Sequence, residues 1–196
     1  MTVGVPRLFL AVWPPEEIVS ELMSLRRKDQ RGVRFVEPDN WHVTLRFLGE
    51  AHIDEVEEAM AEVELPRARV TLGPAVDVIG ERALVVPVAG LDDLATVVAG
   101  ATRHVGEPPS RRRFTGHLTI ARVKRDARMP PALGALVGGG FDVEELCLVR
   151  SRLEPDGARY DTVAAWPISG SGLDDSDGPA GAVASVDVVR SSVRER

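Results

Sequence analysis

The sequence predicts an α+β fold in which antiparallel strands form the sheets and helices lie outside them. The expected elements run strand, helix, strand, helix, several strands, helix and several strands, which is not a regular βαβ alternation. No glycine-rich phosphate loop links a strand to a helix, as a nucleotide-binding α/β fold would require. A His-x-Thr-x motif occurs twice, at His42 and at His117. This repeat permits a pseudo-twofold arrangement, with the two motifs on facing strands across a cleft.

The first strand and the first helix are marked by prolines and by apolar spacing. Arg7–Val12 is a short apolar run between two prolines, which is typical of a strand. From Ile18 onward, leucines follow at positions i+4 and i+7, which predicts an amphipathic helix over residues 15–28. The prolines before this helix fit its start, where a missing N–H group costs nothing.

The middle of the chain alternates short strands with two further helices. The first motif lies in an extended run over residues 41–50 that ends near a glycine. Apolar residues at helical spacing predict helices over residues 53–64 and 91–105. Between these helices, three short strands separated by glycine-containing turns are expected at residues 70–72, 76–79 and 83–88.

The C-terminal part of the fold is expected to be mainly strand. The second motif lies in residues 114–122. Two prolines and an apolar run then predict a short helix over residues 132–137, and three consecutive glycines predict a flexible joint at residues 138–140. Residues 143–152 and 159–166 are expected to pair as a hairpin, because a Pro-Asp-Gly turn signal separates them.

A change of composition near residue 169 divides the chain. Residues 169–181 are rich in Gly, Ser and Asp and contain one large apolar residue, Leu173. Such a segment buries too little apolar surface to offset the entropy of ordering it. We therefore expect one folded domain over residues 1–168 and a disordered tail over residues 169–196.

Composition and charge exclude several classes of protein. The chain is 44% hydrophobic and 28% charged, which is ordinary for a globular protein, and its net charge of −6 does not suit coating of duplex nucleic acid. It has neither an apolar run of about 18 residues nor a secretory signal pattern. The single cysteine, Cys147, lies among apolar residues and is expected to be buried. These features predict a cytoplasmic protein, and we expect a monomer.

The two motifs carry the chemistry of the sequence. Side chains alternate between the faces of a strand, so His42 and Thr44 share one face, as do His117 and Thr119. Two imidazoles suit general acid–base chemistry because a histidine titrates near neutral pH. The two hydroxyls can donate hydrogen bonds to the oxygens of a bound phosphate. Together these groups form a set that can open a cyclic phosphate.

The motifs and their flanks resemble the 2H phosphoesterase superfamily, and within it the RNA 2′,3′-cyclic phosphodiesterases, once called 2′-5′ RNA ligases. The similar segments follow the family order: the strand Arg7–Val12, the two motifs, and a closing hairpin with Tyr160 and Trp166. The resemblance covers about residues 5–168. It implies a bilobal fold, with two antiparallel sheets and outer helices around a central cleft.

The resemblance also implies roles for the motif residues. It assigns the proton donor to His42 and the proton acceptor to His117, and it leaves Thr44 and Thr119 to hold the non-bridging phosphate oxygens. The sequence departs from the family pattern at two positions. Gly116 stands where many members have proline, and Arg150 stands where many have glutamate, which puts a substrate contact at the closing hairpin in doubt.

Further phosphate and base contacts are expected from arginine and aromatic residues. Arginine is a natural phosphate ligand, and Arg46 has the strand parity of His42. Arg122 matches a basic position of the family, but strict alternation directs it away from the motif face, so a bulge or strand end is needed. Phe9 and Trp41 are candidates for stacking on a base, although both residue types are more often part of a core.

The function that the resemblance implies is hydrolysis of an RNA or nucleotide 2′,3′-cyclic phosphate to a 2′-phosphomonoester. The sequence contains no set of Cys, His or carboxylate residues at metal-site spacing, so we expect neither a metal ion nor a cofactor. The expected partners are RNA ends or nucleotides, and no membrane. Two alternatives remain open: 2′-5′ ligation of RNA ends at the same site, and a non-catalytic module that binds RNA ends or nucleotides.

Overall fold

The computed structural model of the protein describes residues 4–80, 82–154 and 157–168. In this part of the chain the α-helices are α1 (Glu16–Met23), α2 (Ile53–Met60) and α3 (Asp92–Ala101), and a short 3-10 helix, η1 (Pro38–Asn40), precedes the first motif. The three longer predicted helices are confirmed, and each ends four or five residues earlier than its apolar spacing suggested. None of these helices is long and apolar enough to cross a bilayer. The predicted tail, residues 169–196, lies outside the described residues.

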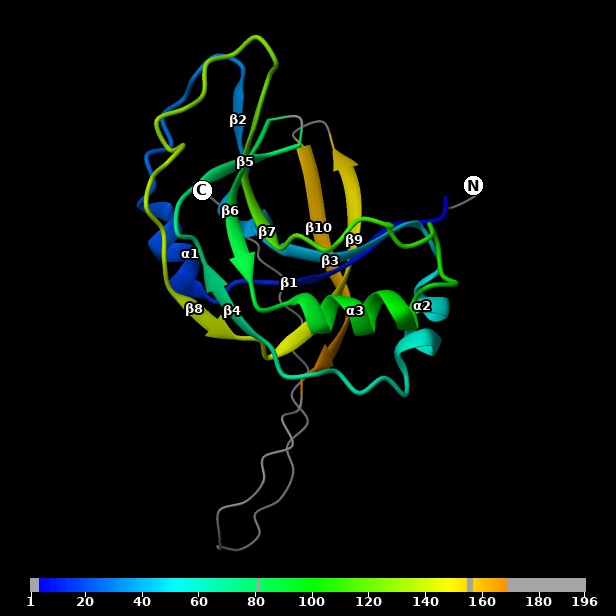
Figure 1. The fold of residues 1–196 in the computed structure, drawn as a ribbon. Coiled ribbons are helices and arrows are strands. Elements are labelled where there is room, and N and C mark those ends of the chain that lie inside the picture. Colours follow the sequence, from blue (N-terminus) through cyan, green and yellow to red (C-terminus); the bar gives the residue numbers. More distant parts are fainter. Residues whose placement is uncertain (1–3, 81, 155–156, 169–196) are drawn as a thin grey trace, which may run out of the picture.

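The strands join edge to edge in one antiparallel path, in the order β10-β9-β1-β3-β7-β6-β4-β8, with β2 added to β7 and β5 added to β6. Their bounds in the described chain are β1 (Arg7–Val12), β2 (Val33–Phe35), β3 (Val43–Glu50), β4 (Arg69–Leu72), β5 (Asp77–Ile79), β6 (Ala83–Ala89), β7 (His117–Val123), β8 (Gly140–Asp142), β9 (Glu145–Glu154) and β10 (Gly157–Pro167). Figure 1 shows β9 and β10 standing on one side of the molecule and β2 and β5 on the other. The α+β class is confirmed; a pseudo-twofold relation between two lobes stays a prediction.

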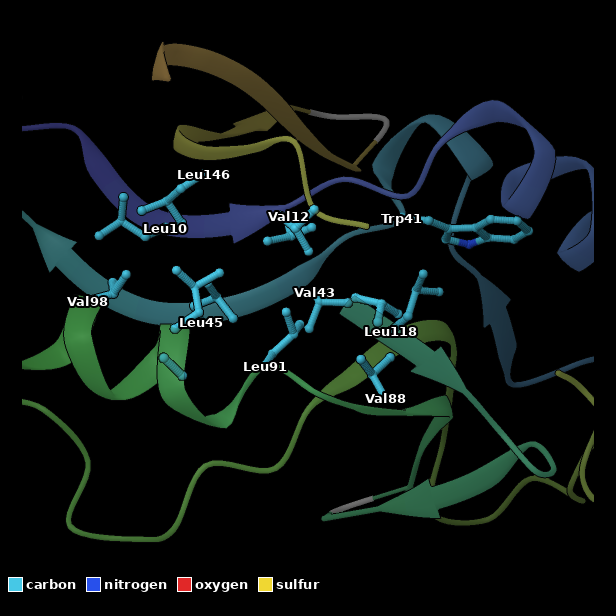
Figure 2. Close-up of a cluster of buried hydrophobic side chains, with 14 of the residues drawn as sticks. Leu10, Val12, Trp41, Val43, Leu45, Val88, Leu91, Val98, Leu118 and Leu146 are labelled. Atoms are coloured by element: carbon cyan, nitrogen blue, oxygen red, sulfur yellow. The ribbon is translucent and has the colours of Figure 1, made fainter. Parts of the chain in front are cut away.

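The main core lies between the sheet and α3. Leu10 of β1, Val43 of β3 and Leu118 of β7 point into it and are at most 1% exposed, and Leu91 packs on them from the start of α3 (Figure 2). Burying a side chain of this size contributes about 1.5–3 kcal/mol. The core therefore fixes which face of β3 and β7 is left for the polar residues of the motifs.

A second, smaller cluster covers the opposite face of β1 and β9. It consists of four buried residues, with Trp13 and Tyr160 packed against them: Phe9, Ala11, Cys147 and Val149. β1 is thus buried on both faces, which explains why its sequence is a continuous apolar run rather than an alternating one. Cys147 is buried as predicted, and burial is the main cause that raises the pKa of its thiol to about 12.

One predicted element is wrong. Residues 131–134 form a turn rather than the start of a helix, and Leu136 makes a single β-bridge to Ala75. The backbone N–H groups of Gly134 and Val137 donate to the carbonyl oxygens of Val76 and Pro74, at 2.9 and 3.0 Å. The apolar spacing predicted a helix here, but the backbone groups of this segment form hydrogen bonds with residues distant in the chain instead of with one another. The glycines that follow lead into β8, and the predicted hairpin is confirmed as β9 and β10.

Candidate active site

The two motifs lie on neighbouring strands of the sheet. Val43, the first residue of β3, is paired with Leu118, the second residue of β7, in antiparallel register. Both side chains point into the core (Figure 2). The histidine and threonine that flank each of them therefore lie on the opposite face. The structure corrects the expectation of facing strands across a cleft, because β3 and β7 are hydrogen-bonded neighbours.

This register sets the relation between the four polar side chains. Antiparallel strands run in opposite directions, so His42 lies across from Thr119 and His117 lies across from Thr44. All four residues are partly exposed, whereas the apolar residues between them are buried. Each imidazole thus has a hydroxyl of the other motif as its cross-strand neighbour, and the four predicted residues come together on one face.

Both histidine rings are held in the same way by the backbone. The Nδ1 atom of His42 is 2.8 Å from the carbonyl oxygen of Asn40, and Nδ1 of His117 is 2.7 Å from that of Thr115. A carbonyl oxygen only accepts, so Nδ1 carries the proton in each bond. When the ring is neutral, Nε2 is the unprotonated nitrogen, and it is left for chemistry. Each ring is therefore prepared to accept or donate a proton at Nε2.

Gly116, the departure before the second motif, is held tightly at its site. A Cβ atom at this position would lie 2.5 Å from the carbonyl oxygen of Val88. The backbone N–H of Val88 donates to the carbonyl oxygen of Gly116 at 2.9 Å. The glycine thus allows β6 to approach the residue before His117 closely, and this contact anchors the start of β7.

His42 is surrounded by aromatic rings. The ring of Phe9 lies 4.9 Å from that of His42, the ring of Tyr160 lies 5.1 Å away and that of Trp13 lies 5.4 Å away, all centre to centre. Burial by these groups is the main cause that lowers the pKa of His42. The bond to Asn40 acts in the opposite direction, and the positive charge of His117 lowers the pKa further.

A β-bulge follows the threonine of the first motif. Ala11 of β1 pairs with Thr44, whereas Leu10 pairs with Arg46, so Leu45 has no partner on β1. An extra residue of this kind reverses the alternation of the strand beyond it. Leu10 belongs to the main core and Ala11 to the smaller cluster, so Thr44 and Arg46 lie on opposite faces.

The parity argument for Arg46 is therefore wrong. Arg46 is 5% exposed, and its guanidinium donates hydrogen bonds to the carbonyl oxygens of Phe47 and Glu107. Burial is the main cause that lowers its pKa. The bulge brings Phe47 to the motif face instead, where it pairs with Phe9 of β1. Arg46 holds the loop after α3 against β3 and lies away from the histidines.

The second motif strand has the same bulge, and there it has the opposite consequence for an arginine. Val85 of β6 pairs with Thr119, whereas the preceding residue of β6 pairs with Ala121, so Ile120 has no partner on β6. The alternation reverses, and Arg122 moves to the face of Thr119, where it is exposed. The bulge that the family position of Arg122 requires is present.

The aromatic candidates from the sequence divide between core and site. Trp41 is 1% exposed and donates from Nε1 to the carbonyl oxygen of Val36 at 3.1 Å, so it is a core residue (Figure 2). Phe9 is also buried, but its ring lies against His42. Sequence reasoning missed Trp13 as a neighbour of His42. Trp13 lies two residues after Ala11 and four after Phe9, so strand alternation directs all three side chains to the same face, and this spacing could have identified Trp13.

The closing hairpin carries a group of ion pairs. Asp161 accepts hydrogen bonds from Nε and Nη2 of Arg152 at 2.8 and 3.0 Å, and Nη2 of Arg150 lies 3.4 Å from its Oδ2 atom. The hydrogen bond from Arg152 is the main cause that lowers the pKa of Asp161 and raises that of Arg152. Arg150 is thus engaged with β10. Ser151, beside it, pairs with Arg7 of β1.

Two further features bear on the chemistry. In residues 4–80, 82–154 and 157–168, no three His, Cys, Asp or Glu side chains gather as a set of metal ligands. A hollow of about 740 Å³ is present, and neither motif histidine lines it. Its walls come from β3, α3 and the loop between α3 and β7, and they include Phe47, Arg112 and Arg113.

The sequence and structure are similar to proteins of one kind. Residues 12–75 match the family model described as LigT like Phosphoesterase. A Thermus thermophilus protein named RNA 2′,3′-cyclic phosphodiesterase is 32% identical over 193 residues, which cover 88% of this chain and 96% of that protein. An Escherichia coli protein of the same name is 28% identical over 173 residues, covering 83% of this chain and 97% of that one.

Comparison with solved structures shows the same similarity. The structure of E. coli LigT complexed with 3′-AMP superposes with a TM-score of 0.69 and 26% identity, over 84% of this chain and 98% of that chain. A Thermus thermophilus structure superposes with a TM-score of 0.66 and 30% identity, over 85% of this chain and the whole of that chain. The similarity therefore extends over nearly the full length of these proteins.

Proposed function

This chain belongs to the RNA 2′,3′-cyclic phosphodiesterase family of LigT-like 2H phosphoesterases, and on that basis we propose that it opens the cyclic phosphate with two histidines and no metal ion. It is an enzyme that hydrolyses the phosphodiester bond of RNA 2′,3′-cyclic phosphates. The observation that carries the proposed mechanism is the matched pair of imidazoles. Both have Nδ1 bound to a backbone carbonyl and Nε2 left for the substrate, and each lies across from a threonine of the other motif.

The proposed reaction is an in-line displacement at phosphorus. His117 takes a proton from water at Nε2 as the water oxygen bonds to phosphorus, and His42 gives a proton from Nε2 to the leaving O3′ as the P–O3′ bond breaks. The products are a 2′-phosphomonoester and a free 3′-hydroxyl group. The reaction leaves His117 protonated and His42 neutral, so the starting state returns when His117 releases a proton to solvent and His42 takes one up.

The charge that builds on phosphorus needs donors in fixed positions. We propose that the hydroxyls of Thr44 and Thr119 donate to the non-bridging oxygens, and that the guanidinium of Arg122 adds a charged donor. The bulge at Ile120 supports this role, because it directs Arg122 to the face of Thr119. Arg46 has no part in this set, because its guanidinium is bound to two backbone carbonyls.

The lowered pKa of His42 bears on its role as the donor. Aromatic burial favours the neutral ring in the free enzyme. An anionic phosphate within hydrogen-bond distance favours the protonated ring instead. We therefore propose that substrate binding supplies the electrostatic condition under which His42 carries its proton, so that the donor is charged when the leaving oxygen is in place.

A local pseudo-twofold relation between the motifs belongs to the same proposal. An axis through the Val43–Leu118 pair exchanges His42 with His117 and Thr44 with Thr119. The shared carbonyl bond at Nδ1 and the shared bulge after the threonine support it. The aromatic groups break this symmetry, since they surround His42, and an asymmetric wall of this kind can select which ribose oxygen faces the donor.

The test uses the purified protein, a panel of nucleoside 2′,3′-cyclic phosphates, and EDTA in one arm. We expect hydrolysis in both arms and a 2′-monophosphate as the main product, identified by phosphorus NMR against authentic 2′- and 3′-monophosphates. A dominant 3′-phosphate would overturn the proposed orientation. Activity lost in EDTA and restored by one divalent ion would overturn the metal-independent mechanism. The bound 3′-AMP of E. coli LigT supports the choice of nucleotides as probes.

A further inference from the structure

The bulge in β3 places a phenylalanine on the motif face, where the chemistry gives it no role. Phe47 is 41% exposed and pairs with Phe9 across β1 and β3. Phe9 in turn lies with its ring centre 4.9 Å from that of His42. Phe9 therefore lies between His42, which its ring contacts, and Phe47, its partner on β3, and of these two phenylalanines only Phe47 is exposed.

An arginine lies on the ring of Phe47. The guanidinium carbon of Arg7 is 5.4 Å from the ring centre, which is within cation–π range. Arg7 has the strand parity of Phe9 and Ala11, because β1 pairs with β9 without a bulge. A cation beside a partly exposed aromatic ring forms a surface on which nucleobases stack irrespective of their sequence.

A hollow adjoins Phe47. It has a volume of about 740 Å³, and Phe47 lines it together with residues of α3 and of the loop after α3. Arg112 and Arg113 line it and are exposed to solvent, and Arg113 lies 3.8 Å from Asp92. Asp92 and Glu107 also line the hollow, so it carries charges of both signs, and the cation that contacts the ring of Phe47 is Arg7.

We propose that Phe47 and Arg7 bind the penultimate nucleotide of an RNA that ends in a 2′,3′-cyclic phosphate, with its base stacked on Phe47. This inference rests on the proposed function. A cyclic phosphate closes the 3′ end, so the neighbouring nucleotide lies on the 5′ side alone. Phe47 is three residues beyond Thr44, or about 10 Å along a strand. Trp13 and Tyr160 are partly exposed and lie nearer to His42, so they are available to contact the base of the terminal nucleoside.

The experiment compares two substrates on the same enzyme preparation. One is adenosine 2′,3′-cyclic phosphate, and the other is the dinucleotide ApA that ends in a 2′,3′-cyclic phosphate. We expect the parental enzyme to have the higher kcat/KM on the dinucleotide. Phe47→Ala should lower the ratio of the two kcat/KM values about tenfold, as expected for one lost stacking contact. Phe47→Tyr should keep the ratio, because the ring is retained.

A matched control is Leu136→Ala, which truncates an apolar side chain that is 85% exposed and lies on another part of the surface. This variant should leave the ratio unchanged. Arg7→Ala should lower it, with a steeper effect at low salt than at high salt, because the contact is electrostatic.

A binding measurement separates stacking from the rate of chemistry. A dinucleotide with 2-aminopurine at the penultimate position and a cyclic phosphate end is bound to the His117→Ala variant, which is expected to hydrolyse it far more slowly than the parental enzyme. We expect its fluorescence to fall on binding, and to fall less when Phe47→Ala is added.

The outcomes are distinct from those that test the reaction itself. An enzyme that hydrolyses neither substrate would overturn the proposed function. An enzyme that hydrolyses both, with a ratio that Phe47→Ala leaves unchanged, would overturn only the assignment of the penultimate nucleotide. The same holds if both rates fall by one factor, since Phe47 would then contact the terminal nucleotide.

Discussion

Val43 and Leu118 lie opposite each other in antiparallel register, and their side chains are 1% exposed on the core side of β3 and β7. This pair joins the two halves of the site. It sets the motif histidines on one face and at a fixed stagger, because residues on either side of a buried position must point outward. The geometry of the motif face therefore depends on two apolar side chains that point into the core.

Truncating this pair should weaken the fold. Leu118→Ala is expected to lower the free energy of unfolding by about 2–5 kcal/mol, since it leaves a cavity in a packed core. Denaturant unfolding followed by circular dichroism measures the change. Leu153→Ala, at a position 92% exposed, is the matched control and should cost far less. A loss for Leu118→Ala as small as that of the control would contradict the packing described.

Removing either motif histidine should stop turnover without unfolding the protein. His42→Ala and His117→Ala are each expected to lower kcat by about 10²–10⁴, the range for a lost general acid or base. Thr44→Ala and Thr119→Ala should lose less, because the other donors remain. His104→Ala is the control, as this exposed histidine lies outside the site. A folded His117→Ala variant with parental activity would refute the assignment.

The pH dependence of kcat/KM should be bell-shaped, with limbs that belong to the coupled pair of histidines. Burial lowers the pKa of His42, so NMR titration of its ring in the free enzyme should give a value below the ordinary 6.5. Trp13→Ala admits water beside this ring, and we expect it to raise the pKa of His42 and to move the bell to higher pH. A ring that titrates above 6.5 in the parental protein would contradict the burial argument.

The same burial predicts a pH dependence of stability. A histidine whose folded pKa is depressed binds fewer protons in the folded than in the unfolded state, in the window between that pKa and about 6.5. Stability should therefore be fully present above pH 6.5 and fall as the pH drops through this window. His42→Gln removes this titration, so the melting temperature of the variant should depend less on pH there.

A second, separate loss is expected at lower pH. Hydrogen bonding from Arg152 depresses the pKa of Asp161 below its ordinary 3.8, so its contribution is present above that value and is lost as the pH falls through the folded pKa. Asp161→Asn should remove this step alone.

The two steps can be told apart. If the melting temperature of His42→Gln changes between pH 5 and 7 in parallel with that of the parental protein, His42 is not the cause of the step in that range.

The two arginines that follow the motifs should behave in opposite ways. Arg122→Ala is expected to lower kcat/KM about 10- to 100-fold with little change in stability, since it removes an exposed charged donor to phosphate. Arg46→Ala is expected to cost about 1–3 kcal/mol of stability, since it leaves buried carbonyl oxygens without donors. Kinetics and thermal melts of both variants check the contrast, and a reversed pattern would refute the face assignment.

The sequence by itself determined the parts of the site that depend on one strand at a time. Alternation along a single strand predicts that each histidine shares a face with its threonine, and the buried residues between them confirm it. The apolar run of β1 and the helical spacing of α1 to α3 are likewise local patterns, and the structure confirms each, as it confirms the pairing of β9 with β10. The spacing of apolar residues predicted helices that end too late in the chain, because apolar spacing can continue beyond the last helical residue.

Only the tertiary structure decided what depends on two paired strands. A bulge exists relative to a partner, so the sequence of β3 alone gives no sign that Leu45 is unpaired and that Arg46 turns into the core. The matching bulge at Ile120 directs Arg122 the other way. The aromatic wall around His42 and the turn that replaced the predicted helix at residues 132–137 also come from segments far apart in the chain. Such contacts form because buried side chains and backbone groups must all find partners at once, a condition that acts on the whole fold rather than on any one segment.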